Sequence, residues 1–208
     1  MLASAIRPQR APRRAAETPA RREALTRERW IEAATEVLVD HGIDDVRVDL
    51  LATGLSVTRG SFYWHFRDRD DLLRAVLQSW RERATEQITA RLQRGNRDPR
   101  VQLREVLSLP FRGRAAARAA RIELALRAWA RHDAMAREAV AEADASRIDY
   151  IGGLFELLGC TRAQARQRAF TLYGHVVAES QLGAIGSHSE RAARRRFVEQ
   201  LLLGRPAR

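Results

Sequence analysis

From Leu25 onward, apolar residues recur at helical spacing along almost the whole chain. The first stripe follows the i, i+3, i+4, i+7, i+8 rule of a helix with one buried face: Trp30, Ala33, Ala34, Val37 and Leu38. Thr26 can cap the start of this helix, and Gly42 can end it. Similar patterns predict helices over 47–54, 59–66, 68–94, 100–108, 115–131, 134–158, 162–185 and 190–203. No stretch alternates as a strand does, so we expect an all-α protein of about nine helices.

The predicted helices fall into two groups. Three short helices and a long fourth one precede the turn-forming residues 95–99 (Gly-Asn-Arg-Asp-Pro), and five helices follow them. Residues 1–24 are rich in Arg, Ala and Pro without periodicity, which predicts a flexible arm. We therefore expect an N-terminal three-helix domain over 25–84, joined by the long fourth helix to a C-terminal helical bundle over 85–208.

The second and third predicted helices are separated by a three-residue turn at 55–57. Two helices joined in this way form a helix-turn-helix, in which the second helix enters the major groove of DNA. This motif, called the reading head below, covers about residues 47–66. The pattern thus predicts a DNA-binding domain.

The third helix carries two kinds of side chain. Phe62 and Phe66 are four residues apart and share one side, which we expect to face Leu38, Leu51 and Leu55 of the core. Donors and flat rings occupy the other faces: Arg59, Ser61, Tyr63, Trp64 and His65. Gly60 allows a partner's backbone to approach closely. The alternative for Tyr63 and Trp64 is that they fill the core as ordinary aromatics.

The segment 52–66, Ala-Thr-Gly-Leu-Ser-Val-Thr-Arg-Gly-Ser-Phe-Tyr-Trp-His-Phe, is followed by Arg-Asp-Asp-Leu-Leu at 69–73 and preceded by Gly42. It resembles the DNA-binding domain of the tetracycline-repressor (TetR) family of bacterial transcription regulators over about residues 25–84. The resemblance implies a cytoplasmic homodimeric regulator with a C-terminal ligand-binding and dimerisation domain. Such a dimer would bind a palindromic operator in double-stranded DNA, and a repressor is the expected form.

The resemblance also implies particular contacts. Thr58, Arg59 and Ser61 would face bases or nearby phosphates, while Tyr63 and His65 would bind phosphates. Arg69 stands where the family usually has Lys, and Arg47 stands where it often has Thr. The full set expected at the DNA is Arg47, Thr58, Arg59, Gly60, Ser61, Tyr63, Trp64, His65 and Arg69. Ser56 occupies a turn position that the family usually gives to Gly, which prefers the left-handed conformation.

The net charge of +11 comes from 37 basic residues, all of them Arg, against 26 acidic ones. Residues 25–80 nevertheless contain seven Arg and ten acidic side chains, so net charge does not locate the DNA site. The acids of the first helix should face away from the DNA. The arm at 1–24 is a candidate for phosphate or minor-groove contacts, and the alternative is a tail that touches nothing in particular.

Two features of the C-terminal region predict tasks. Ring-bearing residues could line an apolar effector pocket, although such residues more often fill a core: Phe111, Trp129, Tyr150, Phe155, Phe170, Tyr173 and His175. The eighth and ninth helices (162–185 and 190–203) carry apolar stripes, with Gly174 and Ala178 permitting close approach. We expect these helices to form the homodimer interface, the alternative being packing within one chain.

Other classes of function find little support in the sequence. The helices after Pro99 contain no catalytic motif, so no enzyme activity, catalytic residue, cofactor or metal site is expected. Cys160 is the only cysteine, and no apolar run is long enough for a membrane span. The expected function is a ligand-responsive repressor with a small, mainly apolar effector. The alternative is a non-specific binder of nucleic acid or anionic surfaces, driven by arginine alone.

Overall fold

The computed structural model describes residues 25–95, 97–183 and 185–204, and all regular structure within them is helical. The arm predicted over residues 1–24 lies outside the described residues. The elements, in order, are α1 (Arg27–His41), the 3-10 turn η1 (Ile43–Asp45), α2 (Val48–Gly54), α3 (Arg59–Phe62), α4 (Arg69–Arg81), the π-helical turn η2 (Glu82–Glu86), α5 (Gln87–Arg94), α6 (Pro99–Ser108), the 3-10 turn η3 (Leu109–Phe111), α7 (Gly113–Ala130), α8 (Ala134–Leu157), α9 (Arg162–Gln181) and α10 (His188–Leu203).

The predicted all-α fold is confirmed, and so are the nine helices, counted over the described residues. The predicted fourth helix over 68–94 is the continuous run of α4, η2 and α5, called the long helix below. Its middle is wound as a π-helix, in which the Gln87 N–H donates to the Glu82 carbonyl. Such turns contain one residue more than an α-helix would, and they occur often at functional sites.

Local sequence accounts for most helix ends. Thr26 and Asp68 accept hydrogen bonds from backbone N–H groups in the first turns of α1 and α4, as cap residues do. Thr161 and Gln164 form the expected reciprocal capping box at the start of α9. Gly42 ends α1 with a φ of 92°, a conformation that a residue with a Cβ rarely adopts.

The third helix is shorter than the pattern predicts. The prediction over 59–66 is wrong at its C-terminal end, because α3 stops at Phe62 and residues 63–65 form a turn. The chain stays compact there, since the Phe66 N–H still donates to the Phe62 carbonyl at 3.1 Å. Phe66 therefore remains on the buried side although it lies beyond the helix.

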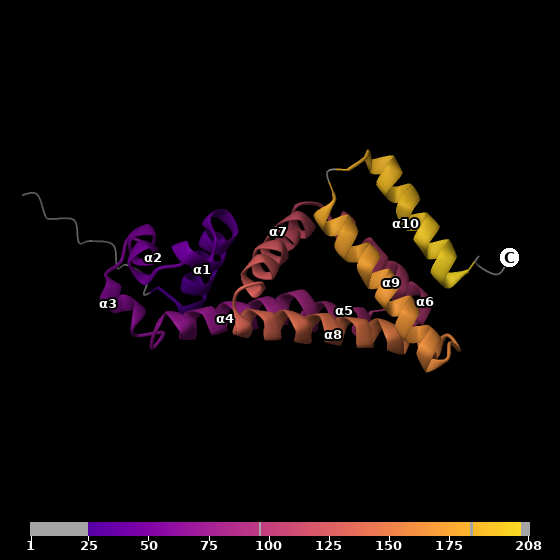
Figure 1. Ribbon diagram of the computed structural model, residues 1–208, viewed down its shortest axis with the longest axis horizontal. Coiled ribbons are helices and arrows are strands. Elements are labelled where there is room, and N and C mark those ends of the chain that lie inside the picture. The colour runs from indigo at the N-terminus through magenta and orange to yellow at the C-terminus, as the bar shows by residue number, and fades with distance from the viewer. Residues whose placement is uncertain (1–24, 96, 184, 205–208) are drawn as a thin grey trace, which may run out of the picture.

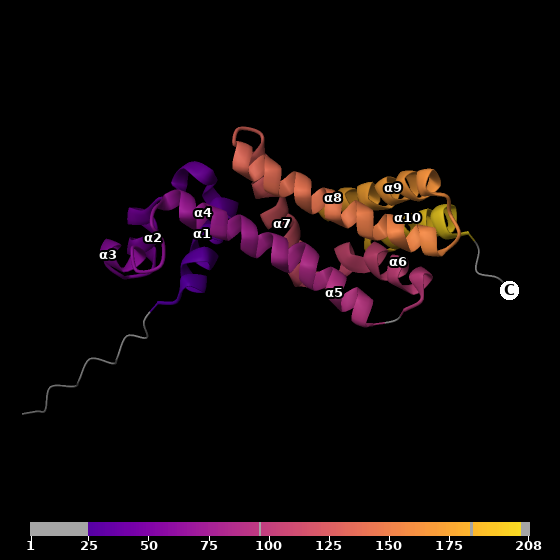
Figure 2. The same ribbon diagram turned by 90° about the horizontal axis from the view of Figure 1, so that it is seen from below.

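The molecule is elongated, with α1, α2 and α3 at one end and α10 near the other (Figure 1). The long helix runs from the first group past α8 toward the other end (Figure 2), and α7 slants between α1 and α9 (Figure 1). Two clusters of buried apolar residues lie along this axis. The second cluster joins α6, α8, α9 and α10 around Phe155 and Leu172.

The first cluster is not confined to the N-terminal domain. It contains Trp30, Phe62 and Trp80, and it continues into α7 and α8 through Leu126, Trp129, Ala136, Val140 and Ala143. Helices α1 and α4 accordingly contact α7 and α8. The N-terminal helices and this end of the bundle therefore share one core.

Candidate DNA interface and effector cavity

The turn between α2 and α3 has the geometry that the motif requires. The Ser56 N–H donates to the Thr53 carbonyl and the Val57 N–H donates to the Ala52 carbonyl, each at 3.0 Å. Ser56 has a φ of 57°, and it is the only non-glycine residue with positive φ in the described chain. A left-handed backbone costs a residue with a Cβ ~1–2 kcal/mol. Ser56 thus takes the conformation expected for the glycine that it replaces.

Two phenylalanines hold the reading head against α1. The Phe62 side chain is fully buried, and its ring meets Trp30 edge to face with 5.4 Å between centroids. Phe66 stacks on Phe62, also at 5.4 Å, and the Arg27 guanidinium lies 4.9 Å from the centroid of the Phe66 ring. The predicted burial of both phenylalanines is confirmed, and it turns the remaining side chains of α3 outward.

Those remaining side chains form an exposed surface. Six residues of the predicted DNA-binding set are exposed: Arg47, Thr58, Arg59, Gly60, Tyr63 and Trp64. Ser61 and His65 are half-buried. The exposed fractions of Tyr63 and Trp64 are 54% and 88%, which excludes the alternative that their rings fill the core. A Cβ placed on Gly60 would meet only the Thr58 Oγ1 atom, at 3.8 Å, so packing within the subunit does not require glycine there.

Two arginines of the predicted set already have partners within the chain. Arg69 donates from Nε to the Val46 carbonyl at 2.7 Å and from Nη2 to the Ile43 carbonyl at 2.6 Å. Its observed role is therefore to fix the loop before α2, and a phosphate contact by Arg69 stays a prediction. Arg47 donates to both carboxylate oxygens of Asp49, at 3.3 and 2.8 Å, so DNA would have to compete with that carboxylate.

The acids of the first helix face α7. Arg118 lies 3.2 Å from Glu36 and 3.8 Å from Glu32, and Arg121 lies 2.7 Å from Asp40. Helix α7 is on the side of α1 remote from α3 (Figure 1). These carboxylates therefore attach α1 to the bundle and do not crowd the exposed face of α3.

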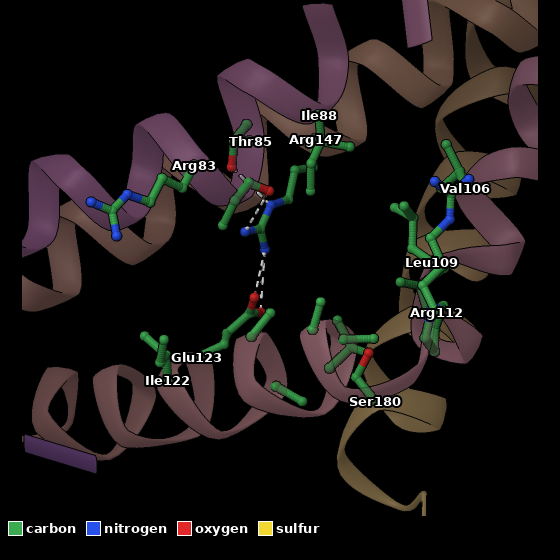
Figure 3. Close-up of a pocket in the computed structure, with 18 of the residues that line it drawn as sticks. Arg83, Thr85, Ile88, Val106, Leu109, Arg112, Ile122, Glu123, Arg147 and Ser180 are labelled. Atoms are coloured by element: carbon green, nitrogen blue, oxygen red, sulfur yellow. Dashed lines mark hydrogen bonds and ion pairs between the residues drawn. The ribbon is translucent and has the colours of Figure 1, made fainter. Parts of the chain in front are cut away.

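A cavity of about 460 Å³ lies between the long helix and α7, within the ~300–1,000 Å³ typical of small-molecule sites (Figure 3). Trp80, Thr85 and Ile88 line it from the long helix, and α6, η3, α8 and α9 supply its other walls. Thr35 of α1 also reaches it. The cavity therefore touches the N-terminal domain directly.

A row of alanines on α7 makes the space. Four of them line the cavity at helical spacing: Ala115, Ala116, Ala119 and Ala120. Methyl groups on this face leave room that larger side chains would fill. The opposite walls are mostly apolar, with Leu92, Val106 and Val176 among them. An apolar ligand body fits such walls.

Of the seven residues predicted to line an effector pocket, Tyr150 and Tyr173 do line this cavity. The Tyr150 hydroxyl donates to Gln102 Oε1 at 2.6 Å, and the Tyr173 hydroxyl donates to Asp144 Oδ1 at 2.5 Å. Burial raises the pKa of both phenols, so both keep their protons at neutral pH.

The structure places the other five elsewhere, which corrects their assignment to this cavity. Trp129 belongs to the shared core and Phe155 to the second core, where it is fully buried. Phe111 lies beneath the guanidinium groups of Arg191 and Arg195. Phe170 is 69% exposed on α9, and His175, also on α9, is half-buried outside the lining.

A cluster of charged groups forms one end of the cavity. This arginine cluster consists of Thr85, Glu123, Arg127, Asp144, Arg147 and Tyr173. Arg127 binds Asp144 through two bonds of 2.9 and 2.7 Å, and it donates to Glu123 at 2.7 Å. Because guanidinium and carboxylate are both planar, this paired contact is strong and directional.

Arg147 joins the cluster to the long helix. Its Nε donates to Thr85 Oγ1 at 3.0 Å, and its Nη2 donates to the Ala84 carbonyl at 3.3 Å, so it holds two residues of η2. Its Nη1 donates to Glu123 Oε2 at 3.1 Å and to the Tyr173 hydroxyl at 2.8 Å. Figure 3 shows Arg147 spanning the gap from the long helix to Glu123 on α7. One guanidinium therefore ties together three helices and the π-helical turn.

Asp144 and Arg127 keep their charges at neutral pH. Burial alone would raise the pKa of Asp144, but hydrogen bonds from Arg127 and Tyr173 outweigh it and lower that pKa. Hydrogen bonds from Arg127 to Asp144 and Glu123 raise the pKa of that guanidinium despite its burial. The pairs thus offset the cost of burying four charges, although such clusters add little stability over an apolar core.

Sequence reasoning missed the arginine cluster. A signal was present, because Glu123 with Arg127 and Asp144 with Arg147 are charged pairs at helical spacings of four and three. That pattern is also typical of a solvated face. Only the packing of α7 against α8 and α9 shows that these charges face inward.

Within the described residues, no helix is both long and apolar enough to cross a membrane. The same residues hold no group of three or more His, Cys, Asp or Glu side chains arranged to bind a metal ion.

The N-terminal helices match known regulators. The model of the family described as "Bacterial regulatory proteins, tetR family" matches residues 31–76. The HTH-type transcriptional regulator SrpR of Pseudomonas putida is 48% identical over 54 residues, which are 26% of this chain and 25% of SrpR. The probable acrEF/envCD operon repressor of Escherichia coli K12 is 40% identical over 89 residues, 41% of this chain and 39% of that protein. The matches thus span a quarter to two fifths of these relatives.

Solved structures match the whole fold at low identity. A transcriptional regulator from Rhodococcus sp. Rha1 has a TM-score of 0.67 at 22% identity, over 86% of this chain and 96% of that one. FadR of Bacillus subtilis in complex with stearoyl-CoA gives 0.62 at 19%, over 87% and 100%. A regulator from Saccharomonospora viridis in complex with choline gives 0.67 at 19%, over 85% and 95%.

These likenesses establish the fold of the C-terminal bundle, while the sequence matches concern the N-terminal helices. The helix-turn-helix at residues 47–66, with its left-handed Ser56 and outward α3, lies wholly within the matched segment. Residues 31–76 thus match the tetR family of bacterial regulatory proteins, and the chain shares its helical fold with solved transcriptional regulators.

Proposed function

We propose that this chain is a ligand-responsive transcriptional repressor that binds a two-fold-symmetric operator as a homodimer. The observation that carries the proposal is the long helix, which starts beside the reading head (Figure 2). The same helix lines the cavity through Trp80, Thr85 and Ile88. A ligand in the cavity acts on DNA through its different affinities for the two arrangements of that helix. Such a regulator works on bacterial DNA, in the cytoplasm, and needs no catalysis.

The exposed face of α3 supports the DNA contact. Thr58, Arg59 and Ser61 lie in the first turn of α3 or just before it, where a recognition helix presents side chains to base edges. Tyr63 and His65 follow in the next turn, and we expect them to bind phosphates beside the groove. These contacts fix register and read sequence together.

Helices α9 and α10 supply the proposed dimer face. Phe170, Gly174 and Ala178 form an exposed stripe on α9, and Ala193, Phe197 and Leu201 form one on α10. The side chains of Phe170, Phe197 and Leu201 are each more than 60% exposed. Exposed apolar stripes on neighbouring helices are typical of a four-helix interface between two subunits.

Other apolar residues of these two helices face inward. Ala165, Ala169, Leu172 and Leu202 are buried within the chain, so they stabilise the subunit itself. Packing within the chain thus accounts for the inward faces of these helices, and the outward faces are left for the proposed dimer. The exposed Phe170, expected at an effector pocket, belongs to the proposed dimer face.

Structural relatives support an effector without fixing its charge. FadR of B. subtilis holds stearoyl-CoA, which is anionic, whereas the S. viridis regulator holds choline, which is cationic. The same helical fold thus accommodates ligands of opposite charge. The effector of this chain has to be inferred from its own cavity.

The test is binding to the DNA that flanks the gene, compared with a shuffled duplex, by fluorescence anisotropy at physiological salt. We expect a preference of about 10³-fold or more for the native duplex. Tyr63→Ala should lower the affinity for the native duplex about tenfold, because it removes one phosphate contact and a ring. Leu124→Ala, at an exposed apolar position on α7, is the matched control and should leave DNA binding unchanged.

Equal affinity for both duplexes, with a steep dependence on salt, would favour the alternative of a non-specific binder. In that case Tyr63→Ala would change little, because any arginine-rich surface could replace the lost contact. Absence of binding to genomic fragments in the ligand-free state would reject the proposed function.

A further inference from the structure

The arginine cluster places a buried cation at the wall of the cavity. The Arg147 side chain is 13% exposed and lines the cavity together with its partners Glu123, Thr85 and Tyr173. Its guanidinium is also 5.4 Å from the centroid of Trp80, another lining residue. A ligand that enters the apolar space between the long helix and α7 therefore meets Arg147 at the polar end (Figure 3).

The charges that line the cavity are unequal. Five arginines face one carboxylate: Arg83, Arg91, Arg112, Arg118 and Arg147 against Glu123. That carboxylate is already neutralised, since Arg127 donates to Glu123 Oε1 at 2.7 Å and Arg147 donates to Oε2 at 3.1 Å. Arg118 is paired with Glu36 of α1, so the excess of positive charge comes from the other four arginines, and the lining has no uncompensated anion.

The contact between Arg147 and Glu123 can be exchanged. If Arg147 Nη1 turns to another anion, Glu123 still keeps its bonds to Arg127 and is not left as an unpaired buried charge. The incoming anion gains a charge-assisted bond in a partly buried site, where such bonds are strongest. A cation placed there would face Arg147 without a free carboxylate.

We propose that the cavity binds an amphiphile with an apolar tail and a carboxylate head, and that this head takes Arg147 Nη1 from Glu123. The inference rests on the proposed function and names the chemical class of its effector. The tail lies along the alanine row of α7, and the head lies at the arginine cluster.

The same exchange acts on the long helix. Arg147 holds Thr85 Oγ1 and the Ala84 carbonyl of η2, and Thr85 is only 3% exposed, so water does not readily replace that bond. Drawing the guanidinium toward the ligand loosens its hold on the π-helical turn, which lies just after α4. A turn with one extra residue is a point where a helix can shift its winding. The ligand's head group therefore acts at the joint between the cavity and α4.

Calorimetry on the DNA-free protein tests the ligand class with three probes of equal chain length: dodecanoate, dodecanol and dodecyltrimethylammonium, all below micellar concentrations. We expect dodecanoate to bind about tenfold or more tighter than dodecanol, because only the anion gains the bond to Arg147. The ammonium probe should bind most weakly. Tightest binding of the ammonium probe, or equal binding of all three, would overturn the proposal.

Two variants should change the affinity for dodecanoate in opposite directions. Glu123→Gln removes the internal competitor for Arg147 and should tighten dodecanoate binding several-fold, while Arg147→Gln should weaken it about tenfold. A purely structural role would make both variants weaken binding. Arg114→Gln, at an exposed position of α7 outside the cavity lining, controls for the loss of one positive charge and should change affinity less than twofold.

Amide hydrogen exchange keeps the test independent of folding defects. Dodecanoate should speed exchange in residues 82–87 of the wild type, and dodecanol should not. Operator binding is measured separately without ligand. If the protein binds its operator but shows no preference for dodecanoate, this inference alone is overturned. If it binds dodecanoate but no operator, the proposed function is rejected and the ligand site stands.

Discussion

Ser56 and Gly60 show how single residues shape the reading head. Ser56 takes the left-handed turn conformation without the freedom of glycine, and Gly60 has that freedom at a helical position where packing does not need it. The first residue carries a conformational cost, whereas the second weakens a very short helix. A substitution at either position should therefore change the stability of the protein and its affinity for DNA to different extents.

Ser56→Gly should stabilise the protein by up to about 1 kcal/mol, because glycine relieves the left-handed strain. Part of this gain is lost, since glycine gives the unfolded chain more conformational entropy. Urea unfolding followed by circular dichroism measures the change. The matched control is Ser79→Gly in α4, which has helical backbone and should lose about 0.5 kcal/mol. A loss of stability in Ser56→Gly would contradict the account of this turn.

Gly60→Ala should leave the fold intact or stabilise it by up to about 1 kcal/mol, since alanine favours the helix. Operator affinity should nevertheless fall by about tenfold, because a methyl group would stand between α3 and the DNA backbone. Anisotropy with the native duplex measures this. Gly153→Ala, exposed on α8 with nothing within 4 Å of the new Cβ, should gain similar helix propensity with unchanged affinity.

At the scale of helices, apolar spacing was sufficient to predict nine elements and the buried side of the reading head. It failed at the end of α3, because four helical residues are too few for periodicity to mark a boundary. It also placed Trp129 and Phe155 at a pocket. Spacing shows that a ring lies on a buried face, but only the neighbouring helices decide whether that face meets a core or a cavity.

The alanine row of α7 gives a prediction at this scale. Ala119→Phe places a ring in the cavity and should weaken dodecanoate binding about tenfold or more, while ligand-free operator binding stays unchanged. Ala117→Phe is the matched control, because that alanine is exposed on α7 and does not line the cavity. Equal effects of the two variants on dodecanoate binding would exclude the alanine row of α7 as the ligand-binding site.

For the whole molecule, the excess of arginine is used largely to join helices. Arg104 pairs with Glu199 between α6 and α10, and Arg191 pairs with Glu179 between α10 and α9. The partly exposed Arg104–Glu199 pair contributes ~0–1 kcal/mol. Glu179 is buried, so its pair with Arg191 chiefly keeps that carboxylate from being left unpaired. Many arginines are therefore engaged inside the chain, which favours a specific DNA surface over a uniformly charged one.

The dimer face gives a prediction for the assembly. Leu201→Glu puts a charge at the C-terminal end of the α10 stripe and should shift the protein from dimer to monomer at micromolar concentration, with a large loss of operator affinity. Sedimentation velocity measures the change, and circular dichroism checks the helices. Leu124→Glu, an equally exposed leucine on α7, should remain dimeric. A dimeric Leu201→Glu would move the interface to another face.

The core shared by α1, α4, α7 and α8 sets a limit on how this protein can be divided. Cutting the chain after residue 84 would separate Trp30 and Trp80 from Leu126, Trp129 and Val140. The fragment would then expose a large apolar surface to water. A chimaera that transplants this DNA-binding domain onto a foreign bundle must therefore bring residues 126–143 along, or supply a matching apolar surface. The segment that has to be exchanged as one piece in such a chimaera is therefore larger than the segment that contacts DNA.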